Sequence, residues 1–119
     1  MNDFFFAQKV YFYRQPVDMR KSIDGLSMLV ISEMQLDPTI NADFVFIGKS
    51  RDKIKILKYD TNGFWLFYKR LIKQRFKWPK SWFENDTLEL TSEQFIFFLR
   101  GCDLEGLKPF KPVRSAHLC

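Results

Sequence analysis

The sequence has little of the chemistry that most catalytic and metal sites require. Its 119 residues include one histidine, His117, and two cysteines, Cys102 and Cys119. A histidine so close to the end of the chain is a poor base for nucleophilic catalysis, because chain ends usually fray. Two cysteines are too few for a disulfide framework, so reduced thiols are expected, and with His117 they match no zinc spacing. We expect no metal, no cofactor and no catalytic centre of these kinds.

Glycine-rich loops and long apolar runs are also missing. The five glycines are isolated from one another, which excludes the phosphate-binding loops of nucleotide hydrolases. No apolar run approaches the roughly 20 residues that span a bilayer. Asp3 stands where a secretion signal carries positive charge. We therefore expect a cytoplasmic protein with no membrane partner.

Aromatic residues are abundant. Fourteen phenylalanines and a hydrophobic fraction of 46% are ample for one buried core in a chain of this length. Disorder is not expected for most of the chain.

Positive charge is concentrated in the middle of the chain. The net charge is +5, yet residues 48–80 carry eleven basic and two acidic side chains, and residues 81–99 carry four acidic and no basic ones. A basic segment of this kind indicates an anion-binding surface. The alternative is that its lysines only protect sheet edges and keep the chain soluble.

Four segments have the composition of β-strands, being rich in β-branched and aromatic residues and ending at turn formers. They are residues 9–13, 43–47, 53–59 and 64–69. A further short strand is predicted at residues 76–79, where Pro79 ends it.

Two helices are predicted. Apolar residues recur at helical spacing over residues 23–34, and Asp18 is the expected N-cap. In the second helix, Thr91 and Gln94 match a capping box, and Gly101 is the expected C-terminal cap. These elements predict a single α+β domain over residues 1–106, a mainly antiparallel sheet of four to five strands with two helices. Residues 107–119 are expected to form an extended basic arm.

Asn62-Gly63 predicts a hairpin between residues 53–59 and 64–69. Strand alternation assigns the side chains to two faces. One face holds Lys53, Lys55, Leu57, Tyr59, Phe64, Leu66, Tyr68 and Arg70, and the other holds Ile54, Ile56, Lys58, Trp65, Phe67 and Lys69. Cations beside flat rings suit contacts with phosphates and bases. The alternative is that the rings belong to the core while lysines reach solvent at its margin.

Several phrases of the sequence resemble one known family in the order in which they occur. They are residues 10–26, 51–57, 62–71, 75–79, 90–94 and 107–112. They resemble the second-frame accessory proteins (TnpB) of bacterial insertion sequences of the IS66 type, which are unrelated to the RNA-guided nuclease that shares the TnpB name. The resemblance covers about residues 9–114. The sequence departs from the family at Lys58-Tyr59, where Tyr-Trp is common, and Lys58 is expected to add charge to the hairpin.

The resemblance implies a small protein that is encoded beside a larger transposase and is needed for efficient transposition. It implies no catalytic residues, because strand cleavage is assigned to the larger protein. We therefore predict a non-catalytic accessory protein of transposition, which is not an enzyme. Its expected partners are DNA, in particular the ends of the element, the transposase of the same element, and a second copy of the chain.

The candidate nucleic-acid-binding residues fall into three groups. Those expected to neutralise phosphates are Lys49, Arg51, Lys53, Lys55, Arg70, Arg75 and Lys77. Those expected to contact bases or sugars are Trp65, Tyr68 and Trp78. Arg14, Arg20 and Lys21 extend the patch to the start of the first helix, where cations oppose the helix dipole and indicate a bound anion.

Two other functions remain open at this point. In the first, the aromatic hairpin and the proline-containing arm dock on the transposase while the lysines face solvent. In the second, acidic residues from distant positions, such as Asp18, Asp43 and Glu89, meet in a metal-dependent nuclease site. Each of these acids also has an ordinary structural role, so we rank the nuclease last.

Overall fold

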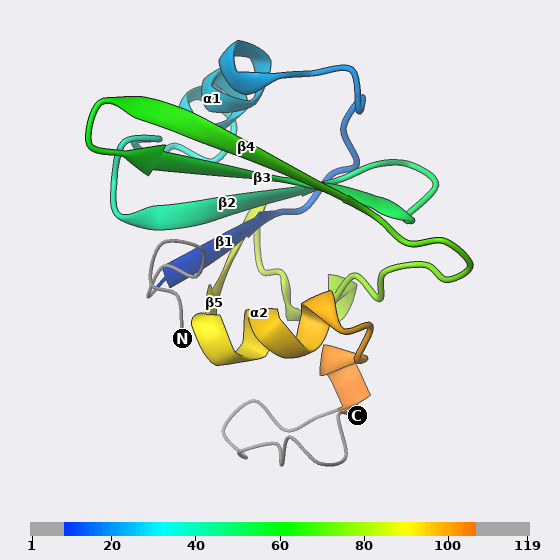
Figure 1. The fold of residues 1–119 in the computed structure, drawn as a ribbon. Coiled ribbons are helices and arrows are strands. Elements are labelled where there is room, and N and C mark those ends of the chain that lie inside the picture. Colours follow the sequence, from blue (N-terminus) through cyan, green and yellow to red (C-terminus); the bar gives the residue numbers. More distant parts are fainter. Residues whose placement is uncertain (1–8, 107–119) are drawn as a thin grey trace.

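A five-stranded sheet runs through the middle of the molecule, with one helix on each of its faces (Figure 1). The structure is a computed structural model that describes residues 9–106. The strands are β1 (Lys9–Tyr13), β2 (Ala42–Ile47), β3 (Lys53–Asp60), β4 (Gly63–Arg70) and β5 (Thr87–Thr91), in the spatial order β4-β3-β2-β1-β5. β1 and β2 are parallel, and every other pair is antiparallel. The predicted fold class is confirmed.

The connection from β1 to β2 contains the first helix, α1 (Ile23–Ser32). Its N-cap is Ser22, so the prediction that Asp18 caps this helix is wrong. The Asp18 carboxylate instead accepts hydrogen bonds from the backbone N–H and the guanidinium of Arg20. The chain is also still extended at Val17, which forms an isolated parallel bridge with Gly48. Helix formation therefore starts one turn later than expected.

The hairpin of β3 and β4 divides its side chains between two faces as predicted. Lys53 lies opposite Arg70, and Leu57 lies opposite Leu66, so both predicted faces are confirmed. The turn lies one residue earlier than expected, because Asp60 pairs with Gly63 and the loop residue in the left-handed region is Thr61, with φ 55°.

The last strand is β5, and the strand predicted at residues 76–79 is not formed. Residues 71–79 have no regular structure and are followed by the short 3-10 helix η1 (Lys80–Trp82). β5 pairs with β1 because its alternating sequence buries Leu90 and exposes Glu89. Thr91 then forms the predicted capping box with Gln94 at the start of α2 (Ser92–Leu99).

Each face of the sheet has its own hydrophobic cluster. Phe12, Val45 and Ile56 pack with Phe95 and Phe98 of α2. On the other face, Phe44, Phe46 and Leu57 pack with Leu26 and Val30 of α1. All six residues of β2 are buried, because this strand is covered on both faces.

The expectation that Lys58 adds surface charge to the hairpin is wrong. Lys58 is buried on the α2 face of the sheet, and its Nζ lies 3.2 Å from Oδ1 of Asp43 on β2. The unusual lysine is therefore compensated by a neighbouring carboxylate inside the sheet.

The last element among residues 9–106 is the 3-10 helix η2 (Leu104–Gly106). The predicted basic arm, residues 107–119, lies outside the described residues.

Candidate nucleic-acid interface

The turn between β2 and β3 presents the first cations of the candidate interface. It is closed by hydrogen bonds from Gly48 N to Lys53 O and from Arg51 N to Gly48 O, both 3.0 Å long. Arg51 is in the left-handed region, with φ 65°, a conformation that is unfavourable for a residue with a Cβ atom. A Cβ atom at Gly48 would lie 2.8 Å from Cγ of Met19, so glycine lets the β1–α1 connection pass close to the turn.

The segment after β4 returns to this same turn. Leu71 N donates to Asp52 O over 2.8 Å, and Phe76 N donates to Arg51 O over 2.6 Å. The chain between Leu71 and Phe76 is therefore a loop whose two ends are fixed on the β2–β3 turn. Its cations lie next to those of the turn.

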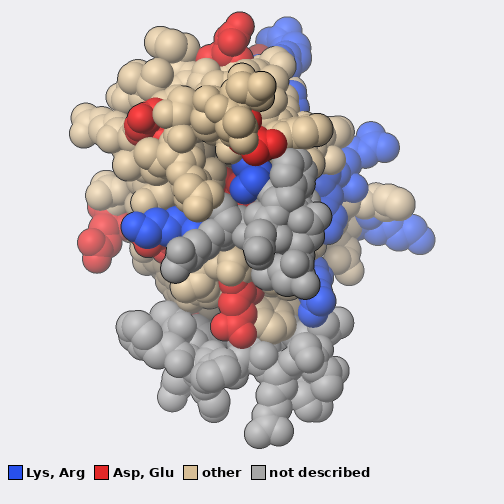
Figure 2. All heavy atoms as spheres, turned by 60° about the vertical axis from the view of Figure 1, so that its left-hand side comes forward, with Lys and Arg blue, Asp and Glu red and all other residues tan. Residues whose placement is uncertain are grey.

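These two segments form a cluster of cations at the end of the sheet where β2 and β4 finish. We call it the basic end. It comprises Lys49, Arg51, Lys53, Arg70, Lys73, Arg75 and Lys77. In the view of Figure 2, most of the visible Lys and Arg side chains gather along one edge of the molecule, while Asp and Glu are scattered over the rest of that face.

One carboxylate lies inside the basic end. Asp52 pairs with Lys53, with 3.0 Å between Oδ1 and Nζ. A hydrogen bond from the Ser50 hydroxyl and the charge of Lys53 both lower the pKa of Asp52 below its ordinary value. Asp52 thus stays ionised and offsets Lys53, whereas no carboxylate pairs with Arg70, Lys73 or Arg75 among the described residues.

Lys55 does not point into solvent as a free phosphate ligand would. Its Nζ donates to the carbonyl oxygens of Met19 at 2.7 Å and Lys21 at 2.8 Å. It also lies 5.9 Å from the ring centroid of Tyr68. Lys55 therefore holds the β1–α1 connection against the sheet. Its charge still adds to the positive field of the basic end.

The predicted extension toward the first helix is only partly present. Arg20 forms a two-pronged pair with Asp18, which offsets its charge and lowers the pKa of that carboxyl. Arg20 and Lys21 precede the helix, but Lys21 adjoins the N-cap Ser22, so its charge still lies near the positive end of the helix dipole. Arg14 directly follows β1, at the end of the sheet where β2 also ends. Its backbone N–H donates a hydrogen bond to Asp86 O, beside β5. Arg14 therefore lies near the β5 edge of the sheet, whereas β4 forms the opposite edge.

The three predicted aromatic residues have three different environments. Trp78 is only 6% exposed and stacks on Phe12 with ring centroids 4.5 Å apart, and this burial argues against the predicted contact with DNA. Trp65 is 49% exposed but lies five residues before Arg70, about 16 Å along the strand from the basic end. Tyr68 is 54% exposed and is the one of the three that lies beside the cations.

Two residues of this region were missed by the candidate set, Lys73 and Ile72. Lys73 is an exposed cation in the loop between Leu71 and Phe76. Ile72, beside it, is 91% exposed. A signal was present in the sequence, because residues 61–83 contain no acidic side chain at all.

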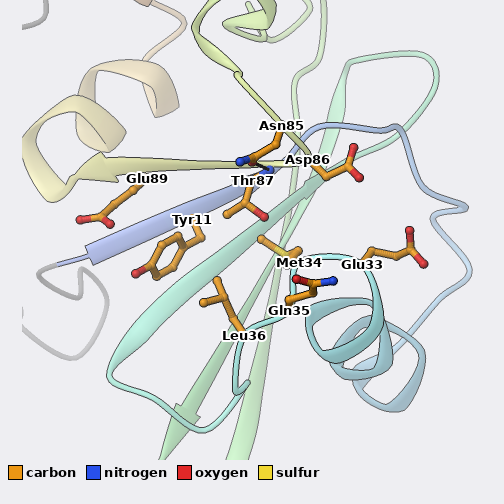
Figure 3. Close-up of a pocket in the computed structure, with 9 residues that line it drawn as sticks. All are labelled: Tyr11, Glu33, Met34, Gln35, Leu36, Asn85, Asp86, Thr87 and Glu89. Carbon is orange, nitrogen blue, oxygen red and sulfur yellow. Dashed lines mark hydrogen bonds between the residues drawn. The ribbon is translucent and has the colours of Figure 1, made fainter.

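An acidic pocket marks the limit of the basic surface on the β5 side (Figure 3). Its volume is about 500 Å³, and its lining includes Tyr11, Glu33, Asp86 and Glu89. Burial and the Glu89 carboxylate raise the pKa of Tyr11 above its ordinary value. The carboxylates of Glu33, Asp86 and Glu89 make this side of the sheet unfavourable for phosphate.

Among residues 9–106, no three His, Cys, Asp or Glu side chains lie close enough together to hold a metal ion. In the same part of the chain, no helix combines the length and the apolar character needed to cross a bilayer.

Comparison with known proteins gives one family and two relatives. Residues 8–109 match the family described as "IS66 Orf2 like protein". The uncharacterized protein y4jC of Sinorhizobium fredii is 33% identical over 100 residues, which are 84% of this chain and 83% of that protein. The uncharacterized protein y4hO of the same organism is 34% identical over 86 residues, which are 72% and 73% of the two chains. No solved structure matches the chain.

Proposed function

Because the chain belongs to the IS66 Orf2-like family of insertion-sequence accessory proteins, we propose that it assists transposition, without catalysis, by binding DNA through its basic end. The transposase and the ends of the element are the partners in this proposal, and the cytoplasm is its location. The observation that carries it is the gathering of seven cations from two distant segments, with one carboxylate among them.

The arrangement suits the phosphate backbone better than a small anion. The cations lie on a turn and on a loop rather than around a closed cavity, so they offer several separate contacts. A duplex presents phosphates at regular intervals, and each contact releases condensed counterions. Arg70 and Arg75 are the strongest candidates, because neither has an ion-pair partner in the described part of the chain.

The test is fluorescence anisotropy with a labelled duplex that carries the terminal inverted repeat, and with a scrambled duplex, over a series of salt concentrations. We expect binding that weakens by about 0.9 log units per log unit of salt for each phosphate contacted. Arg75→Ala should weaken binding to both duplexes and reduce the salt slope by about 1.

A matched pair of variants separates a local contact from the effect of total charge. Arg75→Glu and Lys9→Glu change the net charge equally, but Lys9 starts β1 at the opposite end of the sheet. The proposal requires Arg75→Glu to weaken binding strongly and Lys9→Glu to weaken it little. Equal losses would show nonspecific attraction, and no binding at low salt would overturn the proposal.

A second candidate function is docking on the transposase. It is favoured by β4, an edge strand that carries the half-exposed rings of Trp65 and Tyr68. Such a strand offers backbone groups and flat rings to another chain, which is a second copy or the transposase. Binding to purified transposase that is insensitive to salt and is lost in Trp65→Ala would support this function. DNA binding without transposase would favour the first one.

A further inference from the structure

The loop between Leu71 and Phe76 projects from the end of β4 and turns back toward the sheet (Figure 1). Both of its ends are fixed. Leu71 packs against the hydrophobic cluster on the α2 face, and Phe76 is buried in that cluster and stacks on Phe98 with centroids 5.2 Å apart. The two backbone hydrogen bonds to Asp52 O and Arg51 O hold the same positions. Only four residues span the gap, so the loop has little freedom.

Ile72 is the first residue of this span and is 91% exposed; among residues 9–106, the next most exposed large hydrophobic residue is Met28, at 58%. Its neighbour Leu71 fills the available place in the core. An isoleucine at such a position gains nothing from burial in the free protein. Its neighbours along the chain are cationic or neutral, with Arg70 before it and Lys73 and Arg75 after it.

An apolar tip between cations has a known physical use in DNA recognition. Side chains such as isoleucine can enter the minor groove and partly unstack a base step, while nearby cations hold the phosphates. Unstacking a base step costs a few kcal/mol, so the inserted side chain must keep its position when it presses against the stacked bases. A four-residue loop fixed at both ends meets this requirement, because it cannot easily fold away.

We propose that Ile72 is an apolar wedge that enters the minor groove of duplex DNA and bends it, while Arg70, Lys73 and Arg75 contact the flanking phosphates. This inference rests on the proposed DNA binding and deepens it. It assigns a structural effect on the DNA to one residue that carries no charge.

The experiment measures binding and bending together. A duplex of about 30 base pairs with a donor dye at one end and an acceptor at the other reports bending as increased energy transfer. Anisotropy and salt dependence are measured on the same duplex. The proteins are the wild type, Ile72→Ala, Ile72→Met and, as a control, Ile31→Ala, which removes a half-exposed isoleucine from α1.

We expect the wild type to bend the duplex, and Ile72→Ala to lose most of the bending and roughly tenfold in affinity. The salt slope should not change, because no charge is removed. Ile72→Met keeps an apolar tip and should retain most of the bending, and Ile31→Ala should match the wild type. Thermal unfolding checks that all variants fold, as expected for exposed positions.

The outcomes distinguish the two proposals. If the wild type binds no DNA, the proposed function fails and the wedge fails with it. If the wild type binds with a steep salt slope but Ile72→Ala binds and bends equally, the wedge alone is overturned. Loss of transposase binding in Ile72→Ala with unchanged DNA binding would also overturn it, because the tip would then serve a protein partner.

Discussion

The Nζ atom of Lys58 lies 3.2 Å from Oδ1 of Asp43, between two neighbouring strands and almost without access to solvent. β2 and β3 are both covered here, so both charges are largely shielded from water in the folded state. Each ion therefore depends on the other, together with the polar groups around it.

Removing one member of this pair should be costly. Lys58→Met leaves the Asp43 carboxylate buried without its cation, so we expect the free energy of unfolding to fall by about 3–5 kcal/mol. Urea denaturation measures it. Lys9→Met, on the exposed start of β1, should change it by less than about 0.5 kcal/mol. A double variant, Lys58→Met with Asp43→Leu, should recover much of the loss, and failure to recover would show that Asp43 is held by other partners.

Trp78 should matter for stability and not for DNA affinity. Its ring is stacked on Phe12, and its indole N–H is buried without a hydrogen-bond partner among the described residues. Trp78→Phe keeps the stack and removes that donor, so we expect a stability change below about 1.5 kcal/mol and unchanged DNA binding. Trp78→Ala should lose about 3–5 kcal/mol. Reduced affinity in well-folded Trp78→Phe would contradict this assignment.

Substitutions of Arg51 should separate its effect on the stability of the fold from its effect on DNA binding. Its positive φ costs about 1–2 kcal/mol for a residue with a Cβ atom, and glycine avoids most of this cost. Glycine also loses more backbone entropy on folding, which offsets part of the gain. We expect Arg51→Gly to be more stable than Arg51→Ala by up to about 1 kcal/mol, with the same loss of DNA affinity in both. Thermal unfolding and anisotropy test the two effects separately.

Stability should depend on Glu105 in the acid range. Hydrogen bonds from the hydroxyl and backbone N–H of Ser81 lower the pKa of Glu105 below its ordinary value of 4.5. A lowered pKa in the folded state stabilises the protein above pH 4.5, and this contribution is lost as the pH falls through the folded-state pKa. Glu105→Gln should therefore melt at a lower temperature than the wild type at pH 7, and the difference should shrink below pH 4.5. A constant difference at all pH values would exclude this linkage.

Local sequence patterns predicted the hairpin and its two faces, because a loop of two residues and one of four both place Lys53 and Arg70 on the same face. They also predicted the cap of α2 from Thr91 and Gln94. They failed where a residue had a choice of partners. Asp18 is a good helix cap by type, yet its carboxylate bonds to Arg20, and the chain beside it follows the end of β2.

In the candidate site, too, local patterns predicted the segment but not the partners of its side chains. The basic segment of residues 48–80 contains all seven cations of the basic end, but sequence alone did not separate exposed cations from engaged ones. Lys55 and Lys58 lie three residues apart and look alike in the sequence, yet one holds carbonyl oxygens of a distant loop and the other neutralises a buried acid. Contacts over 15 or more residues decide this, and local patterns do not record them.

β2 is shared by both hydrophobic clusters, since Val45 and Ile47 face α2 while Phe44 and Phe46 face α1. Neither layer can lose its packing without exposing one side of this strand, so the two halves of the molecule should unfold as one cooperative unit. The backbone amides of β2 should exchange with solvent only through global opening. The loops of the basic end are attached to this unit at both ends, so the proposed binding of DNA there would transmit a force on the DNA to the whole sheet.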